Sequence, residues 1–332
     1  MRRLAAAIPV LALCAGIPAA ASPGADPLTW LQKAAASARE TTYAGTVMHM
    51  SGERTATTRV THLFVAGAEH EKIESLDGPR REVVRHNDEL QCFYPDAKTI
   101  RLDRRVTARF FPSLVVGPTE TIPENYVLRL GKVERVLGTD CQWIHLDPRD
   151  ALRYAQRVCA ELASGLLLRA RTLGSRQQIL EQFTFTDLRQ GAQVSRSELK
   201  STFHAQSKDW RRDNQPRDEA KQVATGWGVS APPPGFRLVS EMQRRMPNRA
   251  QPVSQLVFSD GLATMSVFVE PMTNPPRTAE TTNEDGALSV FVRPMGEHLV
   301  TVLGEVPPAA AQQVGRAVTK QAQQAGAGNA SK

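Results

Sequence analysis

Residues 76–85 read Leu-Asp-Gly-Pro-Arg-Arg-Glu-Val-Val-Arg (LDGPRREVVR), and this stretch decides which kind of fold the chain builds. Asp77-Gly78-Pro79 is expected to be a turn, because glycine takes backbone angles that other residues avoid and proline fixes its own. Arg81–Arg85 is then long enough for one strand and too short for a helix. Side-chain alternation leaves neither face of that strand purely charged.

The same short-strand pattern extends from residue 43 to about residue 190. Runs rich in valine, threonine, phenylalanine and tyrosine alternate with turn signals, which is typical of an antiparallel meander. Further strands are predicted at residues 89–94, 141–146, 152–161, 166–173 and 178–188. In the last of these, Phe183 and Phe185 would share one face, with the threonines that follow them on the other.

A helix is predicted before the meander, with Asp26 as its N-cap and Pro27 at its first position. Apolar residues recur at helical spacing through Ala38, so one stripe should dock on the sheet. Residues 110–127 contain three prolines and are expected to form a loop with helical pieces and outward-leaning apolar side chains. That loop would be either the lid of an apolar cavity or an ordinary cover of the core.

The chain changes character after the meander. Residues 204–222 are polar and lack apolar periodicity, as a linker does. Strand patterns then return, and Asp260-Gly261 predicts a tight hairpin between residues 255–259 and 262–269. A second hairpin is expected over residues 288–303, followed by a helix opened by Pro307-Pro308. The last residues, 321–332, read as a disordered tail.

The first residues have the pattern of an export signal. Arg2 and Arg3 form a positive start, an apolar run follows to Ile17, and Ala19-Ala20-Ala21 offers a cleavage site. The apolar run is too short to span a bilayer as a helix. We therefore predict that residues 1–21 are a signal peptide cleaved near Ala21 and that the mature protein is periplasmic.

The composition is that of a globular protein with a basic balance. Hydrophobic residues make up 41% of the chain and charged residues 23%, which argues against a disordered protein. The formal charge is +7, and it falls by two if Arg2 and Arg3 leave with the signal. A basic protein favours nucleic acid, anionic lipid or acidic protein segments. Export makes nucleic acid the least suitable of these, so no nucleic-acid partner is expected.

Motifs for catalysis and metal binding are scarce. The sequence has no G-x-S-x-G elbow, no H-E-x-x-H pair and no phosphate-binding glycine loop, and its seven histidines lack metal-ligand spacing. Ser197-Glu198-Leu199-Lys200 matches S-x-x-K, but the elements that accompany it in serine hydrolases do not follow. We expect no enzyme, cofactor or metal site, and a hydrolase that uses Ser197 and Lys200 is kept only as an alternative.

Arginines recur along the first part of the meander. Because guanidinium groups pair well with phosphate and carboxylate, these arginines are a candidate anion site, although a solvated strand face is the alternative. Together with the apolar loop that follows, they form the set of candidate lipid- or peptide-binding residues: Arg80, Arg81, Arg101, Arg104, Arg105, Phe110, Phe111, Leu114 and Val115.

Three cysteines remain after the signal: Cys92, Cys141 and Cys159. Thiols of exported proteins tend to pair. Cys141 and Cys159 flank a predicted hairpin at similar distances from its turn, so a cross-strand disulfide is one interpretation. Two small buried side chains are the other.

Several motifs together resemble the RseB/MucB family, the periplasmic negative regulators of the sigma-E (AlgU) envelope-stress response. The opening stretch resembles the DGPRREVV signature of that family. Later segments resemble further family motifs in the same order: residues 111–114 (FPSL), 179–183 (ILEQF), 234–236 (PGF), 258–262 (FSDGL) and 302–308 (VLGEVPP).

The resemblance implies an α+β chain of two domains. Residues 22–203 would form a curved antiparallel half-barrel with covering helices around an apolar cavity, similar to the lipoprotein carriers LolA and LolB. Residues 204–222 would be the linker and residues 223–320 a smaller C-terminal α+β domain. A curved meander cannot bury its concave face by flat packing, so a cavity suits this architecture.

The resemblance also implies a regulatory binding protein. Members bind the periplasmic part of an RseA/MucA-type anti-sigma factor and shield it from the site-1 protease, and lipopolysaccharide or a related amphiphile releases it. In the C-terminal domain, the candidate partner contacts are Phe258, Asp260 and Leu262. A homodimer is considered as well. The alternative function is that of a periplasmic lipid or lipoprotein carrier of the LolA type, against which the second domain argues.

Overall fold

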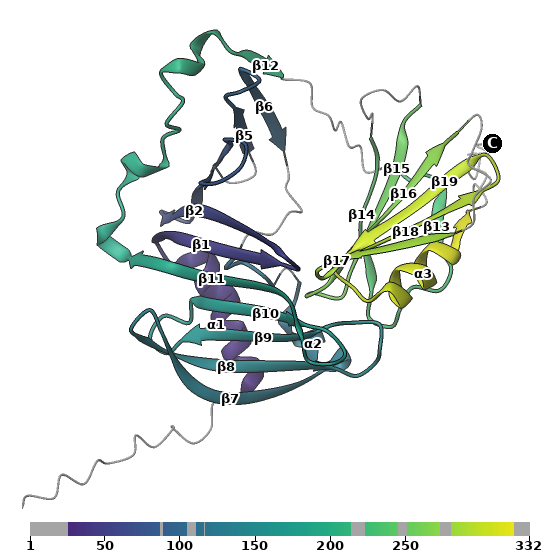
Figure 1. The fold of residues 1–332 in the computed structure, drawn as a ribbon, viewed down its shortest axis with the longest axis horizontal. Coiled ribbons are helices and arrows are strands. Elements are labelled where there is room, and N and C mark those ends of the chain that lie inside the picture. The colour runs from purple at the N-terminus through teal and green to yellow at the C-terminus, as the bar shows by residue number, and fades with distance from the viewer. Residues whose placement is uncertain are drawn as a thin grey trace, which may run out of the picture.

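The computed structural model describes residues 26–86, 89–104, 111–115, 117–213, 223–244, 251–272 and 280–321. These residues form two large β-sheets, each with a helix packed on one face, and a two-stranded pair of β13 with β20 (Figure 1). The predicted signal peptide lies outside the described residues, as does the predicted tail beyond residue 321.

The first helix, α1 (Pro27–Glu40), packs across the first sheet (Figure 1). It begins at Pro27 as predicted, because a first-turn residue needs no backbone N–H donor. Asp26 occupies the N-cap position as predicted, although its side chain makes no capping hydrogen bond. Leu31 and Ala34, one turn apart, form the buried stripe.

Twelve strands of the described residues form the first sheet in the order β12-β6-β5-β4-β3-β2-β1-β11-β10-β9-β8-β7. Neighbours are antiparallel except for β12 and β6. The strands are β1 (Tyr43–Ser51), β2 (Arg54–Val65), β3 (Ala68–Ser75), β4 (Glu82–His86), β5 (Glu89–Tyr94), β6 (Thr99–Arg104), β7 (Tyr126–Val136), β8 (Thr139–Pro148), β9 (Ala155–Glu161), β10 (Leu167–Leu173), β11 (Ile179–Gln190) and β12 (Arg211–Asp213).

The meander predicted from the sequence is confirmed. The opening stretch forms the turn before β4, which begins one residue later than expected, at Glu82. Gly78 adopts a φ of +66°, the left-handed conformation that a turn of this kind requires. The predicted hairpin around residue 150 is formed by β8 and β9, and both are antiparallel neighbours in the sheet.

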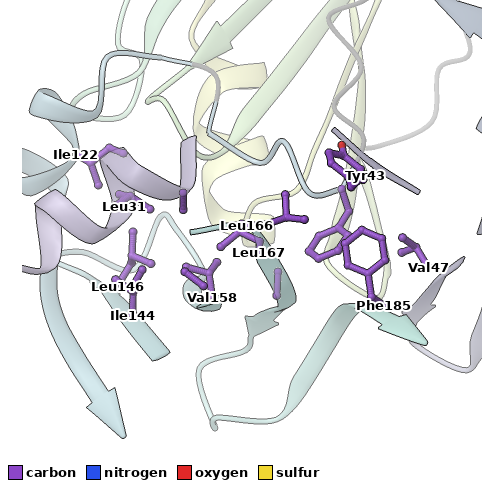
Figure 2. Packing of buried hydrophobic residues seen from close by; sticks show 14 of the residues in the cluster. Leu31, Tyr43, Val47, Ile122, Ile144, Leu146, Val158, Leu166, Leu167 and Phe185 are labelled. Atoms are coloured by element: carbon purple, nitrogen blue, oxygen red, sulfur yellow. The ribbon is translucent and has the colours of Figure 1, made fainter. Parts of the chain in front are cut away.

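A single hydrophobic cluster joins α1 to the sheet (Figure 2). Leu31 of α1 faces Leu146 and Val158 of the strands, and Phe185 of β11 lies beside Tyr43 of β1. The rings of Tyr43 and Phe185 meet edge to face with their centroids 6.1 Å apart. This cluster fixes the helix on the inner face of the sheet, where burial of large apolar side chains is the main stabilising term.

The segment after β11 runs along the outside of the sheet in short 3₁₀ turns (Figure 1). The buried Glu82 carboxylate accepts a hydrogen bond from the Thr202 backbone N–H at 3.0 Å, and Lys72 Nζ donates to the Lys200 carbonyl at 3.1 Å. Residues 211–213 of the stretch expected as a linker then pair with β6 as β12. The polar composition gave no signal for this strand, because β12 lies at an exposed sheet edge where period-2 patterning is absent.

The second sheet has the strand order β14-β15-β16-β19-β18-β17 in the described residues. Its helix, α3 (Pro308–Arg316), packs on β18 and β19 and begins as predicted at the second proline. The other elements are β13 (Trp227–Val229), β14 (Arg237–Arg244), β15 (Val253–Ser259), β16 (Thr264–Pro271), β17 (Thr281–Asp285), β18 (Leu288–Met295), β19 (His298–Gly304) and β20 (Val318–Lys320). Both predicted hairpins, β15–β16 and β18–β19, are confirmed.

The β15–β16 hairpin turns through four residues, 260–263, which we call the hairpin tip. The prediction of a tight Asp-Gly turn is wrong in this detail. Asp260 Oδ1 accepts hydrogen bonds from the backbone N–H groups of Leu262 at 3.0 Å and Ala263 at 2.8 Å. The carboxylate therefore builds the wider turn, as aspartate side chains commonly do in loops.

Candidate functional site

A cavity of about 80 Å³ lies under α1 on the inner face of the first sheet. Its walls are mostly aliphatic and aromatic, with a polar rim at one side. The lining residues are Leu31, Phe111, Leu114, Val115, Leu146, Gln156, Val158, Leu167, Ala170, Arg171, Thr172, Glu181, Phe183, Leu262 and Glu305. A surface of this chemistry accepts an alkyl chain better than a polar ligand.

The loop before α2 (Ile122–Asn125) closes one side of this cavity. Phe111 is 4% exposed, and its ring stacks on that of Phe183 with centroids 5.7 Å apart. Leu114 and Val115 pack against the same cluster. These side chains lean inward, so the expectation that they lean outward is wrong. The predicted face of Phe183 and Phe185 is confirmed, since both contact the Phe111 ring.

The polar part of the cavity wall includes Gln156, Thr172 and Glu181. Glu181 Oε1 lies 2.7 Å from His49 Nε2, and the His49 ring stacks on Phe183 with centroids 4.1 Å apart. The Arg171 side chain points away from the cavity, since it donates from Nε to Gln182 Oε1 at 2.7 Å and lies over the Trp143 ring, and both partners lie on the opposite face from Phe183 and Ile144. Burial lowers the pKa of the Arg171 guanidinium, and the positive charge of Arg169 lowers it further.

The arginines selected from the sequence lie elsewhere. Arg80 pairs with Asp96 at 3.3 Å, and both side chains are well exposed. Arg81 is exposed at the start of β4, and Arg101 lies 3.8 Å from Asp213. Among the described residues that line the cavity, none is one of these arginines. Arg105 and Phe110 lie outside the described residues, and of Arg104 only the backbone is described.

The three candidates of the second sheet have separate roles. Phe258 is 5% exposed inside the core of the second sheet. Leu262, at the hairpin tip, instead packs against the core of the first sheet. Asp260 lies between these two cores, and its side chain is fully buried.

Asp260 takes part in a buried network that joins the two sheets. Its Oδ2 accepts hydrogen bonds from Arg153 Nε at 2.7 Å and from the Tyr126 hydroxyl at 3.1 Å. Arg153, whose side chain is also 0% exposed, donates further to Asp150 and to the Pro234 carbonyl. Sequence reasoning missed Arg153 and Tyr126, because neither belongs to a charge run or a motif.

The pKa shifts at this junction follow from burial and charge. Burial raises the pKa of Tyr126 well above 10.0, and the neighbouring Asp260 charge acts in the same direction. Burial alone would lower the pKa of Arg153, but hydrogen bonds and ion pairs with Asp260 and Asp150 outweigh it and raise that pKa. Arg153 therefore keeps its positive charge, and its hydrogen bond to Asp260 holds the hairpin tip against the first sheet.

A second, larger groove of about 320 Å³ runs along this junction. One wall comes from residues 117–125 and the other from β14, β15 and the hairpin tip. Glu124 and Arg237 face each other across it at 3.9 Å, both exposed. Gly235 has a φ of +77°, and a Cβ at this position would clash with the Asn125 side chain. Glycine thus permits the close approach of the two domains here.

Cys141 and Cys159 form a disulfide between β8 and β9, with their Cα atoms 5.5 Å apart.

The Ser197 hydroxyl shares a hydrogen bond of 2.8 Å with Ser195 in a 3₁₀ turn, where Glu198 pairs with Arg189. The S-x-x-K match thus falls within a capping turn.

Among the described helices, none is long and apolar enough to cross a bilayer.

The fold and the site define a class of two-domain binding proteins. In this class a curved sheet with a helix packed on its inner face encloses an apolar cavity, and a smaller α+β domain packs against it. The chain belongs to the MucB/RseB family. Residues 26–203 match the family's N-terminal domain and residues 221–319 its C-terminal domain. The predicted family and α+β fold class are confirmed by these matches and by the structural likeness given next.

Two curated relatives and one solved structure show how far the likeness extends. The sigma factor AlgU regulatory protein MucB of Pseudomonas aeruginosa is 30% identical over 307 residues, which cover 91% of this chain and 93% of the relative. The sigma-E factor regulatory protein RseB of Salmonella typhimurium is 26% identical over 77% of this chain and 79% of the relative. The Pseudomonas aeruginosa MucA/MucB complex structure matches with a TM-score of 0.73 and 28% identity, over 90% of this chain and 100% of that chain.

Proposed function

We propose that this chain is a periplasmic regulator that binds the periplasmic part of a MucA/RseA-type anti-sigma factor. In this role it protects the anti-sigma factor from site-1 proteolysis and so restrains the sigma-E response. The observation that carries the proposal is the likeness, across both domains, to MucB in its complex with MucA. Residues at both walls of the junction groove are the first place to look for contacts with the partner.

The proposed compartment is the periplasm, reached through the signal peptide at residues 1–21. The Cys141–Cys159 disulfide supports an oxidising compartment, since cytosolic thiols are kept reduced. A regulatory binding role also suits this site, which consists of an apolar cavity and a groove at the domain junction.

The second part of the proposal is release by lipopolysaccharide or a related amphiphile. The aliphatic cavity under α1 supports it, because its walls suit an alkyl chain. A lipid that favours one conformation and a peptide that favours another weaken each other's binding by the same factor.

Binding to the anti-sigma factor is tested by a pull-down from envelope extract with the mature protein. We expect recovery of a single-span anti-sigma factor, and then a Kd of about 1 µM or below for its periplasmic segment. In the presence of this chain the segment should be cleaved more slowly by a site-1 protease. A segment that is cleaved at the same rate with and without the chain would exclude the protective role.

A lipoprotein carrier of the LolA type remains the second candidate, because the apolar cavity also suits that function. A carrier would co-purify with an acylated lipoprotein and hand it to an acceptor. Purified protein without any acylated cargo, together with measurable binding to the anti-sigma segment, decides for the regulator.

A further inference from the structure

One wall of the first domain's cavity is supplied by the second domain. Leu262, at the hairpin tip, lines the cavity together with Leu31 of α1 and Phe183 of β11. It packs against the hydrophobic cluster of the first sheet, although its strand neighbours belong to the second sheet. An aliphatic side chain of the protein itself therefore already lies where an apolar ligand would bind.

The cavity in this arrangement is closed to large ligands. Its volume of about 80 Å³ is well below the roughly 300–1,000 Å³ of pockets that bind organic ligands. Phe111 and Val115 close one side of it and Leu262 closes another. An acyl chain of any length needs at least one of these groups to withdraw.

Leu262 is the group best placed to withdraw as part of a unit. Its backbone N–H is held by Asp260, and Asp260 is held in turn by Arg153 and Tyr126 of the first domain. Moving Leu262 out of the cavity therefore strains the same turn that carries the ion pair between the domains. The two contacts are only two residues apart on one short turn, so a displacement of the turn backbone moves both.

We propose that Leu262 is a built-in occupant of the cavity that competes with the acyl chain of an amphiphile. Binding of the acyl chain displaces the hairpin tip, breaks the Arg153–Asp260 pair and undocks the second domain. Leu262 is thus the residue that sets the affinity of the cavity for lipid. This inference rests on the lipid-release part of the proposed function and supplies its mechanism.

The test compares the binding of dansyl-undecanoic acid, below its micelle-forming concentration, to the mature protein and its variants. Leu262→Ala should lower the Kd of the probe about tenfold, because the competing side chain is gone. Leu238→Ala, a matched leucine that is 47% exposed on the same domain, should leave the Kd unchanged. Equal probe affinity of Leu262→Ala and the unmodified protein would overturn the proposal.

A second readout reports undocking directly. Small-angle X-ray scattering of the unmodified protein should show a larger radius of gyration when the probe is bound. The increase should be smaller in Leu262→Ala, whose cavity accepts the chain without moving the tip. Probe binding to the unmodified protein with no change in scattering would contradict the coupling.

Two further measurements keep the outcome decisive. If Leu262→Ala does not fold, Asp260→Asn weakens the hold on the same tip and must also tighten probe binding. Affinity for the anti-sigma segment is measured in parallel without probe. If the unmodified protein does not bind the segment, the proposed binding function is refuted and the role of Leu262 is not. An unchanged probe Kd in the variants refutes only the role of Leu262.

Discussion

The Arg153–Asp260 pair at the domain junction allows a quantitative prediction. Both side chains are 0% exposed, and Nε of the arginine lies 2.7 Å from the carboxylate. Removing one partner of a buried pair strands the other charge and typically costs about 3–5 kcal/mol, more than the pair itself contributes. We therefore expect two single substitutions to be costly and the double substitution to cost less than their sum.

The magnitudes follow from the remaining contacts. Arg153→Met leaves Asp260 with the Tyr126 hydroxyl and two backbone N–H donors, so the cost falls near the lower limit, about 3 kcal/mol. Asp260→Asn keeps the acceptor for the turn and loses a charged hydrogen bond, at about 2 kcal/mol. With no buried charge left, the double variant should cost about 3 kcal/mol, which gives a coupling energy of about 2 kcal/mol.

The assay is native-state hydrogen exchange at the amides of Leu262 and Ala263, which donate to Asp260. Exchange reports the local opening free energy, which is better defined here than a global unfolding energy for a two-domain chain. The matched control is Glu124→Gln with Arg237→Met, an exposed pair across the same junction, for which we expect no measurable coupling. Additive costs for Arg153 and Asp260 within about 0.5 kcal/mol would refute the reasoning.

Three further predictions concern other parts of the chain. Unreduced, unfolded mature protein should show one reactive thiol, from Cys92, and Cys141→Ala with Cys159→Ala should lower the unfolding free energy by about 3 kcal/mol; three reactive thiols would exclude the disulfide. Burial lowers the pKa of His62 below 6.5 in the folded state, so the unfolding free energy should fall as pH drops from 6.5 through that lowered value; an unchanged slope in His62→Gln would assign the effect elsewhere. Gly235→Ala should loosen the junction by about 1–3 kcal/mol, measured by the same exchange assay, whereas Gly296→Ala, also at positive φ but with open space around it, should leave that exchange unchanged.

Local sequence patterns correctly predicted much of the first sheet. The turn at Asp77–Pro79 and the strand after it follow from backbone preferences of three residues, and the alternation of Phe183 and Phe185 predicts the inner face correctly. Such signals lie within one element, so neighbouring residues suffice to read them. The predictions fail where the position of a side chain depends on an element far away in the sequence. Phe111 was expected to lean outward, but it packs inward because its ring stacks on that of Phe183.

The candidate site was harder to predict for the same reason. Arginine runs attract attention in a sequence, but runs such as Arg80-Arg81 face solvent or pair with nearby carboxylates. The arginine that matters at the junction, Arg153, stands between an alanine-leucine pair and a tyrosine and matches no motif. Its role arises only when β15 and its turn are brought against β7 and the β8–β9 loop, more than 100 residues away in sequence.

The hairpin tip combines a turn, an ion pair between the domains and an apolar contact with the cavity. Asp260 shapes the turn through two backbone hydrogen bonds and simultaneously receives the charge of Arg153. Leu262 is positioned by that same turn in the cavity of the other domain. Because the ion pair at Asp260 and the apolar contact at Leu262 both lie on this four-residue turn, a displacement of the turn changes the cavity and the junction together. A coupling of this kind needs no pathway of intermediate residues, since a ligand that displaces Leu262 acts directly on the element that holds the domains together.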